Sequence, residues 1–167
     1  MDEESSRLLR SLLDTRRVAA LATLHRGEPA ASMVPFVLAS EDARLLIHVS
    51  ELATHTRDML ETPRVSVLVA AGTDGPWLPH ALPRVSLQCD ARPLERSGGQ
   101  YASAKSRYLD CFAEAEQMFE LGDFSLFALG PISARLVAGF GRAYSLAGDA
   151  LQAWLRTRPG DSGLARE

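Results

Sequence analysis

The chain has 167 residues, of which 46% are hydrophobic, and its formal charge at pH 7 is −3. This length is typical of one globular domain, and charges of both signs are interspersed without a basic block, which argues against nucleic acid as a partner. No apolar run reaches the roughly 20 residues of a membrane span, and the acidic start "MDEES" differs from a signal peptide, so we expect a soluble cytoplasmic protein with no membrane partner.

The first half of the chain predicts a helix, a hairpin, a strand and a second helix. Leucines at helical spacing in residues 2–15 indicate an amphipathic helix. Two apolar stretches in residues 18–39 flank Arg26 and Gly27, a turn composition that predicts an antiparallel hairpin. A turn at residues 40–42 leads to a strand over 43–50, and the helix that follows ends before Pro63.

The second half predicts further strands with helices between them. Strands are expected over 64–71 and 84–94, separated by a Gly- and Pro-rich surface loop. Residues 99–121 read as helical in one or two pieces, and two strands follow, over 124–130 and 132–140. A short helix begins near Asp149, and the last residues are expected to be disordered. Together these elements predict a mainly β (α+β) fold, an antiparallel barrel or sheet with helices packed outside.

Polar side chains crowd the first turns of the helix that follows Val49. If Leu52, Met59 and Leu60 form its buried stripe, residues 54–57 surround an exposed helix start. Free backbone N–H groups and the positive end of the helix dipole favour a phosphate there, with Arg57 as a source of charge. Ordinary capping by Ser50 or Thr54 is the equally weighted alternative.

The strand over 84–94 alternates between an apolar and a polar face. Arg84 and Gln88 lie on the polar face, about 13 Å apart at the usual strand rise, and both can line one extended ligand. The commoner alternative for such a face is simple exposure to solvent.

Other motifs are weak. "AGFGRAY" lacks the third glycine of a dinucleotide fingerprint, so its glycines more simply let the backbone bend or approach a ligand or a second subunit, with Arg142 at the same place. The four histidines do not stand at a metal-ligand spacing, so no metal site is predicted. Cys89 and Cys111 belong to no CxxC pair, and no serine lies in a nucleophile elbow.

Four segments taken together resemble the pyridoxamine 5′-phosphate oxidase-like FMN-binding split-barrel family. They are "RRVAALATLHRGEPAASMVPFVL", "LLIHVSELATHTRDMLETPRVSVLVA", "LPRVSLQCDARPL" and "FELGDFSLFALGPISARLVAGFGRAY". Within that family the chain is most similar to the heme-utilisation (HugZ-like) branch, in which "S-x-L-A-x-H-T" and a terminal "GGFGRA" are typical. The resemblance implies a six-stranded antiparallel split β-barrel over residues 1–146, a homodimer with FMN at the subunit interface, and a C-terminal helix and tail over 147–167.

The resemblance also assigns residues to the cofactor by position. It places one group along the flavin, a second around the ribityl phosphate and a third within reach from other strands. These are Ser32, Val34 and Pro35; Ser50, His55, Thr56 and Arg57; and Arg84, Gln88 and Arg142.

The implied function is that of an FMN-binding oxidoreductase acting on a small molecule, with no catalytic residue assigned. The alternatives are a heme-binding or heme-utilisation protein that uses the same cleft, and a non-catalytic FMN-binding dimer. Family members that degrade heme ligate iron through a histidine near the C-terminus, whereas the last histidine here is His80. His55 and Thr56 stand where the family often has an Arg-Lys pair, and Asp58 stands where Asn is common.

Overall fold

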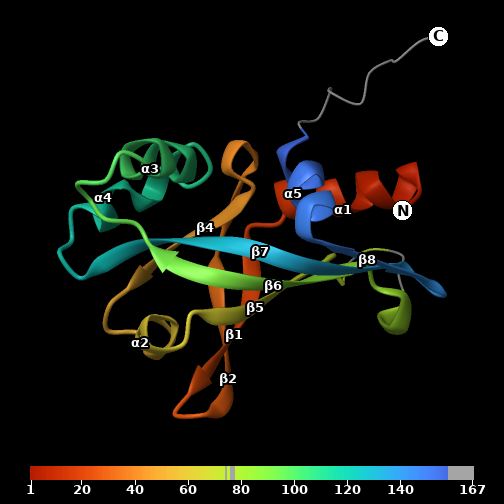
Figure 1. Ribbon diagram of the computed structural model, residues 1–167, viewed down its shortest axis with the longest axis horizontal. Coiled ribbons are helices and arrows are strands. Elements are labelled where there is room, and N and C mark those ends of the chain that lie inside the picture. Colours follow the sequence, from red (N-terminus) through yellow and green to blue (C-terminus); the bar gives the residue numbers. More distant parts are fainter. Residues whose placement is uncertain (74, 76–77, 158–167) are drawn as a thin grey trace, which may run out of the picture.

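One antiparallel sheet dominates the computed structural model, which describes residues 1–73, 75 and 78–157 (Figure 1). The strand order is β2-β1-β5-β6-β7-β4-β3, and β8 pairs with β7, so the described residues form eight strands. The strands are β1 Val18–His25, β2 Glu28–Pro35, β3 Val37–Ala39, β4 Arg44–Ser50, β5 Arg64–Ala70, β6 Arg84–Pro93, β7 Phe124–Gly139 and β8 Arg142–Ala147. The sheet curls into a half-barrel with flanking helices, which confirms the predicted split barrel, with eight strands in place of six.

The β1–β2 hairpin forms as predicted. Arg26 and Gly27 connect the two strands with φ values of +53° and +85°. Two successive residues with positive φ are typical of a type I′ turn, whose twist matches that of the flanking strands. The turn fixes a register in which Val18 pairs with Pro35 and His25 pairs with Glu28.

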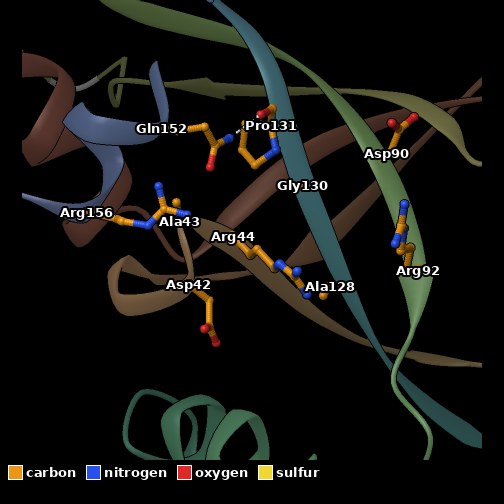
Figure 2. A pocket seen from close by; sticks show the side chains of 10 residues that line it. All are labelled: Asp42, Ala43, Arg44, Asp90, Arg92, Ala128, Gly130, Pro131, Gln152 and Arg156. Carbon is orange, nitrogen blue, oxygen red and sulfur yellow. Dashed lines mark hydrogen bonds between the residues drawn. The ribbon is translucent and has the colours of Figure 1, made fainter. Parts of the chain in front are cut away.

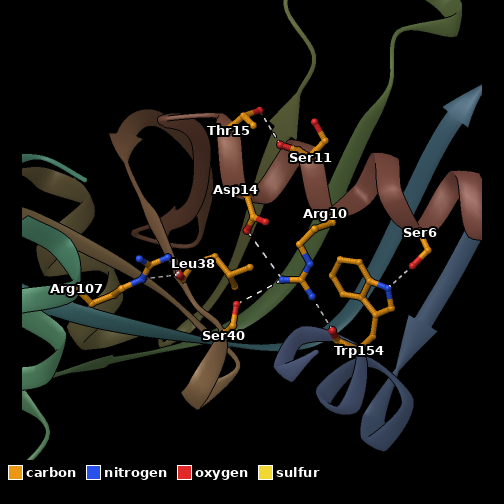
Figure 3. Close-up of polar contacts among 9 residues, drawn as sticks. All are labelled: Ser6, Arg10, Ser11, Asp14, Thr15, Leu38, Ser40, Arg107 and Trp154. Atoms are coloured by element: carbon orange, nitrogen blue, oxygen red, sulfur yellow. Dashed lines mark hydrogen bonds and ion pairs between the residues drawn. The ribbon is translucent and has the colours of Figure 1, made fainter. Parts of the chain in front are cut away.

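Helices α1 (Glu3–Thr15) and α5 (Gly148–Arg156) lie side by side against the main core (Figure 1). Each contributes leucines to that core: Leu9, Leu12 and Leu13 from α1, and Leu151 and Leu155 from α5. Figure 3 shows how the two helices are joined: the Arg10 guanidinium donates to the Trp154 carbonyl at 2.8 Å, and the Trp154 ring nitrogen donates to Ser6 Oγ at 2.7 Å. The predicted C-terminal helix is therefore present, and residues 158–167 lie outside the described part of the chain.

A second, smaller core lies under α3 (Tyr101–Leu109) and α4 (Glu116–Phe119), which cover β3 and β4. This confirms the prediction of helical structure over 99–121 in two pieces, with the short 3-10 helix η3 (Ala113–Ala115) between them. The His48 ring stacks on Phe119 with 3.7 Å between centroids. Arg107 donates to the Leu38 carbonyl at 3.1 Å and ties α3 to β3 (Figure 3).

The two strands predicted over 124–130 and 132–140 are one continuous strand, β7. Gly130 and Pro131 do not end it, because the register with β6 shifts there: Gln88 pairs with Ser133 and Cys89 with Pro131. A bulge tolerates a proline because no ladder hydrogen bond is required from its missing N–H. The segment after Phe140, which was not predicted to be a strand, forms β8 on the free edge of β7.

Helix α2 (Thr54–Glu61) buries different residues from those predicted. Leu52 and Leu60 are 77% and 58% exposed, so the predicted apolar stripe is wrong for both, and only Met59 is buried. The buried face also contains Thr56 and Asp58, which are 1% and 2% exposed. Polar residues occupy this face because they find hydrogen-bond partners on β1 and β4.

The predicted surface loop over 72–83 is only partly described, because residues 74, 76 and 77 lie outside the described set. Its described part contains a 3-10 helix, η2 (Pro79–Ala81), in which Pro79 and His80 are exposed and Ala81 is half-buried. Across the helices of the described chain, none combines the length and apolar character needed to traverse a lipid bilayer.

Candidate functional site

The start of α2 presents backbone donors without a side-chain cap. Ala53 occupies the N-cap position and makes no side-chain hydrogen bond, so the predicted alternative of capping by Ser50 or Thr54 is wrong. The first N–H groups of a helix have no partner within the helix and favour an anion. Arg57 is exposed beside them and makes no hydrogen bond or ion pair with the described residues.

Two of the residues predicted to surround a phosphate, Ser50 and Thr56, form hydrogen bonds within the fold instead. Thr56 is buried and its hydroxyl donates to the Ser50 carbonyl at 2.7 Å, which fastens α2 to the end of β4. Ser50 Oγ accepts from the Leu52 N–H at 3.2 Å in the turn before the helix. Thr56 is therefore a structural residue, whereas His55 and Arg57 remain available to a ligand.

Two buried polar atoms on different elements lack a partner among the described residues: Ser32 Oγ on β2 and His55 Nε2 on α2. Buried polar atoms are nearly always hydrogen-bonded, so each of these atoms indicates a place for a ligand or an ordered water. Burial lowers the pKa of His55, and the nearby Asp58 carboxylate opposes that effect only in part. His55 is therefore a neutral imidazole at pH 7, able to donate or accept one hydrogen bond.

The other two residues predicted on β2 face opposite ways. The Val34 side chain is 2% exposed and belongs to the main core, so only its backbone can border a ligand. Pro35 is exposed and pairs with Val18.

Arg84 and Gln88 share the polar face of β6, as the alternation predicted, while Cys89 on the opposite face is fully buried. Arg84 is half-buried and donates to the Leu82 carbonyl at 2.9 Å. Gln88 is exposed and donates to Ser66 Oγ at 3.3 Å. Both side chains can therefore face a ligand or a second subunit on this side of the sheet.

The structure does not bring Arg142 to the start of α2. Arg142 lies on β8 and donates to Asp2, Glu4 and Ser5 at the start of α1. The Glu4 contact above all raises the pKa of the Arg142 guanidinium. The Tyr144 hydroxyl also donates to Asp2 and, with the Ser5 N–H, holds the pKa of that carboxyl far below its usual range. Within one chain, Arg142 therefore joins β8 to α1.

Sequence reasoning missed a buried carboxylate centre on the other side of α2. Asp58 accepts from the Thr23 hydroxyl and pairs with His25 Nδ1, both at 2.8 Å. Burial raises the pKa of Asp58, but the two hydrogen bonds and the electrostatic effect of the neighbouring histidines outweigh it, so the pKa lies below its usual value. No signal in the sequence indicates these contacts, because His25 and Thr23 precede Asp58 by 33 and 35 positions.

An exposed apolar area covers the side of β1, β2 and β5 that faces away from the core. Met33, Ala20 and Leu68 form one row across the three strands, and Val18 and Pro35 form the next; we call these five residues the apolar face. Met33 is 69% exposed, Val18 48% and Leu68 39%.

Within the described part of the chain, no group of three or more His, Cys, Asp or Glu residues is placed to hold a metal ion.

The curled antiparallel sheet and its flanking helices define a split-barrel protein. A model of the pyridoxamine 5′-phosphate oxidase family matches residues 6–138, and the chain belongs to that family.

Several relatives carry names that refer to heme. The chain is 31% identical to heme oxygenase HutZ of Vibrio cholerae over 138 residues, which cover 81% of this chain and 77% of HutZ. It is 29% identical to the non-canonical heme oxygenase HOZ of Arabidopsis thaliana, a chloroplastic protein, over 89% of this chain and 46% of HOZ. The structure of a heme-binding protein from Mycobacterium smegmatis matches with a TM-score of 0.81 and 31% identity, over 92% of this chain and 62% of that protein. The chain thus spans less than two thirds of the second and third relatives.

Proposed function

We propose that this protein binds heme and serves in heme utilisation. The observation that carries the proposal is the similarity to proteins named for heme at about 30% identity over most of this chain. Heme would supply the iron redox chemistry when bound, and the chain would supply binding and orientation.

The start of α2 is the place we propose for an acidic group of the ligand. Heme carries two carboxylates, and uncapped N–H groups with the exposed Arg57 provide donors for one of them. The unpaired His55 Nε2 supplies a further hydrogen-bonding atom on the same helix, and Ser32 Oγ on β2 is a second unpaired atom. The same donor set suits a phosphate.

We propose that two copies of the chain pair through the apolar face and hold the ligand between them. A contiguous exposed apolar area is typical of an interaction surface. Met33→Glu would place a charge at a position of this face that is 69% exposed and is expected to yield monomers in analytical ultracentrifugation. Leu121→Glu, at an apolar site elsewhere that is 47% exposed, should leave the dimer intact. A wild-type monomer, or a dimer unchanged by Met33→Glu, would contradict this arrangement.

Heme titration tests the main proposal. Added hemin should give a saturable Soret band in the purified protein, and Arg57→Ala should weaken binding about tenfold through the loss of one charge-assisted hydrogen bond. Arg7→Ala is the matched control, because Arg7 is an exposed arginine on α1 whose ion pair among the described residues is with Glu3. The absence of a saturable Soret band would refute heme binding.

FMN is the second candidate ligand, favoured by the family to which the chain belongs and by the phosphate-compatible start of α2. On this alternative the protein is a flavoprotein and an oxidoreductase, or a dimer that binds FMN without turning over a substrate. Titration should then quench flavin fluorescence and raise the melting temperature. Mass spectrometry of the ligand released from freshly purified protein distinguishes heme from FMN directly.

We further propose a cytoplasmic location. Cys89 and Cys111 are both free thiols, and unpaired cysteines are typical of a reducing compartment.

A further inference from the structure

A pocket of about 270 Å³ lies between the start of β4, the end of β6, the middle of β7, and α5 (Figure 2). None of the residues assigned above to heme, to FMN or to the apolar face lines it. Its volume lies just below the roughly 300–1,000 Å³ of a typical pocket for a drug-sized ligand, so it suits a small ligand best.

Three arginines from three different elements line this pocket: Arg44 from β4, Arg92 from β6 and Arg156 from α5. In residues 1–73, 75 and 78–157, none of the three makes an ion pair or a side-chain hydrogen bond. Arg10 and Arg107 behave differently, because both donate to backbone carbonyls and hold elements together (Figure 3). The three pocket arginines are therefore not required to join parts of the fold.

The carboxylates in the pocket do not neutralise these arginines. Asp90 is already paired with Arg64 at 2.9 Å. Asp42 makes no ion pair with the described residues, and Figure 2 shows its carboxylate directed away from Gly130. The lining thus keeps an excess of positive charge.

Gly130 and Ala128 line the pocket on β7, and their small size leaves space beside the strand. Gly130 lies inside β7, opposite Asp90, and its φ is not positive. A Cβ added at Gly130 would meet only the Asp90 carbonyl, at an ordinary 3.8 Å. Neither the backbone nor the packing therefore requires glycine, although glycine weakens a strand, and an interior strand glycine often marks the close approach of a ligand.

We propose that this pocket binds a small polyanion that presents phosphate oxygens. The planar guanidinium matches phosphate oxygens with two parallel hydrogen bonds, and three arginines on separate elements can contact such a group from different sides. A larger side chain at position 130 would occupy the volume that the anion needs.

Isothermal titration calorimetry with inorganic pyrophosphate tests the proposal. Arg44→Ala and Arg92→Ala should each weaken binding at least about tenfold, and Gly130→Leu should abolish it. Arg135→Ala is the matched control, because Arg135 is an exposed arginine on β7 outside the pocket. Unchanged circular dichroism and melting temperature of the two arginine variants would show that they fold, so the result does not depend on the glycine variant.

Three outcomes would overturn the proposal: no binding by the wild-type protein at millimolar pyrophosphate, equal weakening by Arg135→Ala, or binding unaffected by Arg44→Ala and Arg92→Ala. Heme and FMN titrations of the same variants should match the wild type. The pocket and the proposed function can therefore fail independently.

Discussion

Replacement of Asp58 by alanine should lower the free energy of unfolding by about 2–4 kcal/mol. The carboxylate accepts two hydrogen bonds, and those to a charged group contribute about 1.5–3 kcal/mol each. His25 is 43% exposed at its side chain and can bond to water after the change, whereas the Thr23 hydroxyl is buried and would lose its partner. The expected loss is therefore smaller than the sum of two full bonds, yet large against a typical total of about 5–15 kcal/mol.

Urea denaturation followed by circular dichroism at fixed protein concentration measures this change. Asp58→Asn is the isosteric control and should lose about 1–2 kcal/mol, since an amide oxygen still accepts one hydrogen bond. Thr23→Val combined with Asp58→Ala should be less destabilising than the two single changes added together, because the hydroxyl no longer lacks a partner. A loss below about 0.5 kcal/mol for Asp58→Ala, or strict additivity in the double variant, would refute a linked buried centre.

The pH dependence of the same centre follows from the lowered pKa of Asp58. Because the folded-state pKa lies below the unfolded value of about 3.9, the stabilisation is present above that pH and is lost as the pH falls through the folded-state pKa. Below about pH 4 the wild-type protein should therefore lose stability faster than Asp58→Asn does.

Three further predictions concern the main core, His48 and the thiols. Leu21→Ala should lower the free energy of unfolding by about 2–5 kcal/mol in urea, because Leu21 is fully buried in the main core. Burial, with help from neighbouring cations, lowers the pKa of His48 to about 4, so stability should fall as the pH drops from about 6.5 towards 4, and His48→Leu should flatten that part of the urea-midpoint profile. Burial raises the pKa of the Cys89 thiol to about 12, so a thiol reagent should modify only the half-buried Cys111 in the native protein and both cysteines after denaturation.

Local patterns were sufficient to predict most strands and helices. The β1–β2 hairpin follows from the Arg26-Gly27 turn, and the polar face of β6 follows from alternation, because both signals lie within a few neighbouring residues. The continuity of β7 could not be predicted, because Gly130 and Pro131 are typical of the end of a strand. Their pairing with β6 keeps them within the strand.

The environment of α2 depends on remote partners. Three apolar residues suggested its buried stripe, but Leu60 points outward and Asp58 inward because Thr23 and His25 satisfy the carboxylate. A helical pattern within eight residues contains no information about those partners. The arginine pocket has the same limitation, since Arg44, Arg92 and Arg156 are brought together only by the topology of the sheet.

The long strand β7 also has a consequence for biosynthesis. Its first half pairs with β4 and most of its length pairs with β6, although β4 is made about 75 residues earlier in the chain. Until β7 emerges from the ribosome, β4 and β6 present unpaired edges to other nascent chains. Closure of the half-barrel must therefore wait until β7 has been made, when one strand joins the parts made before it.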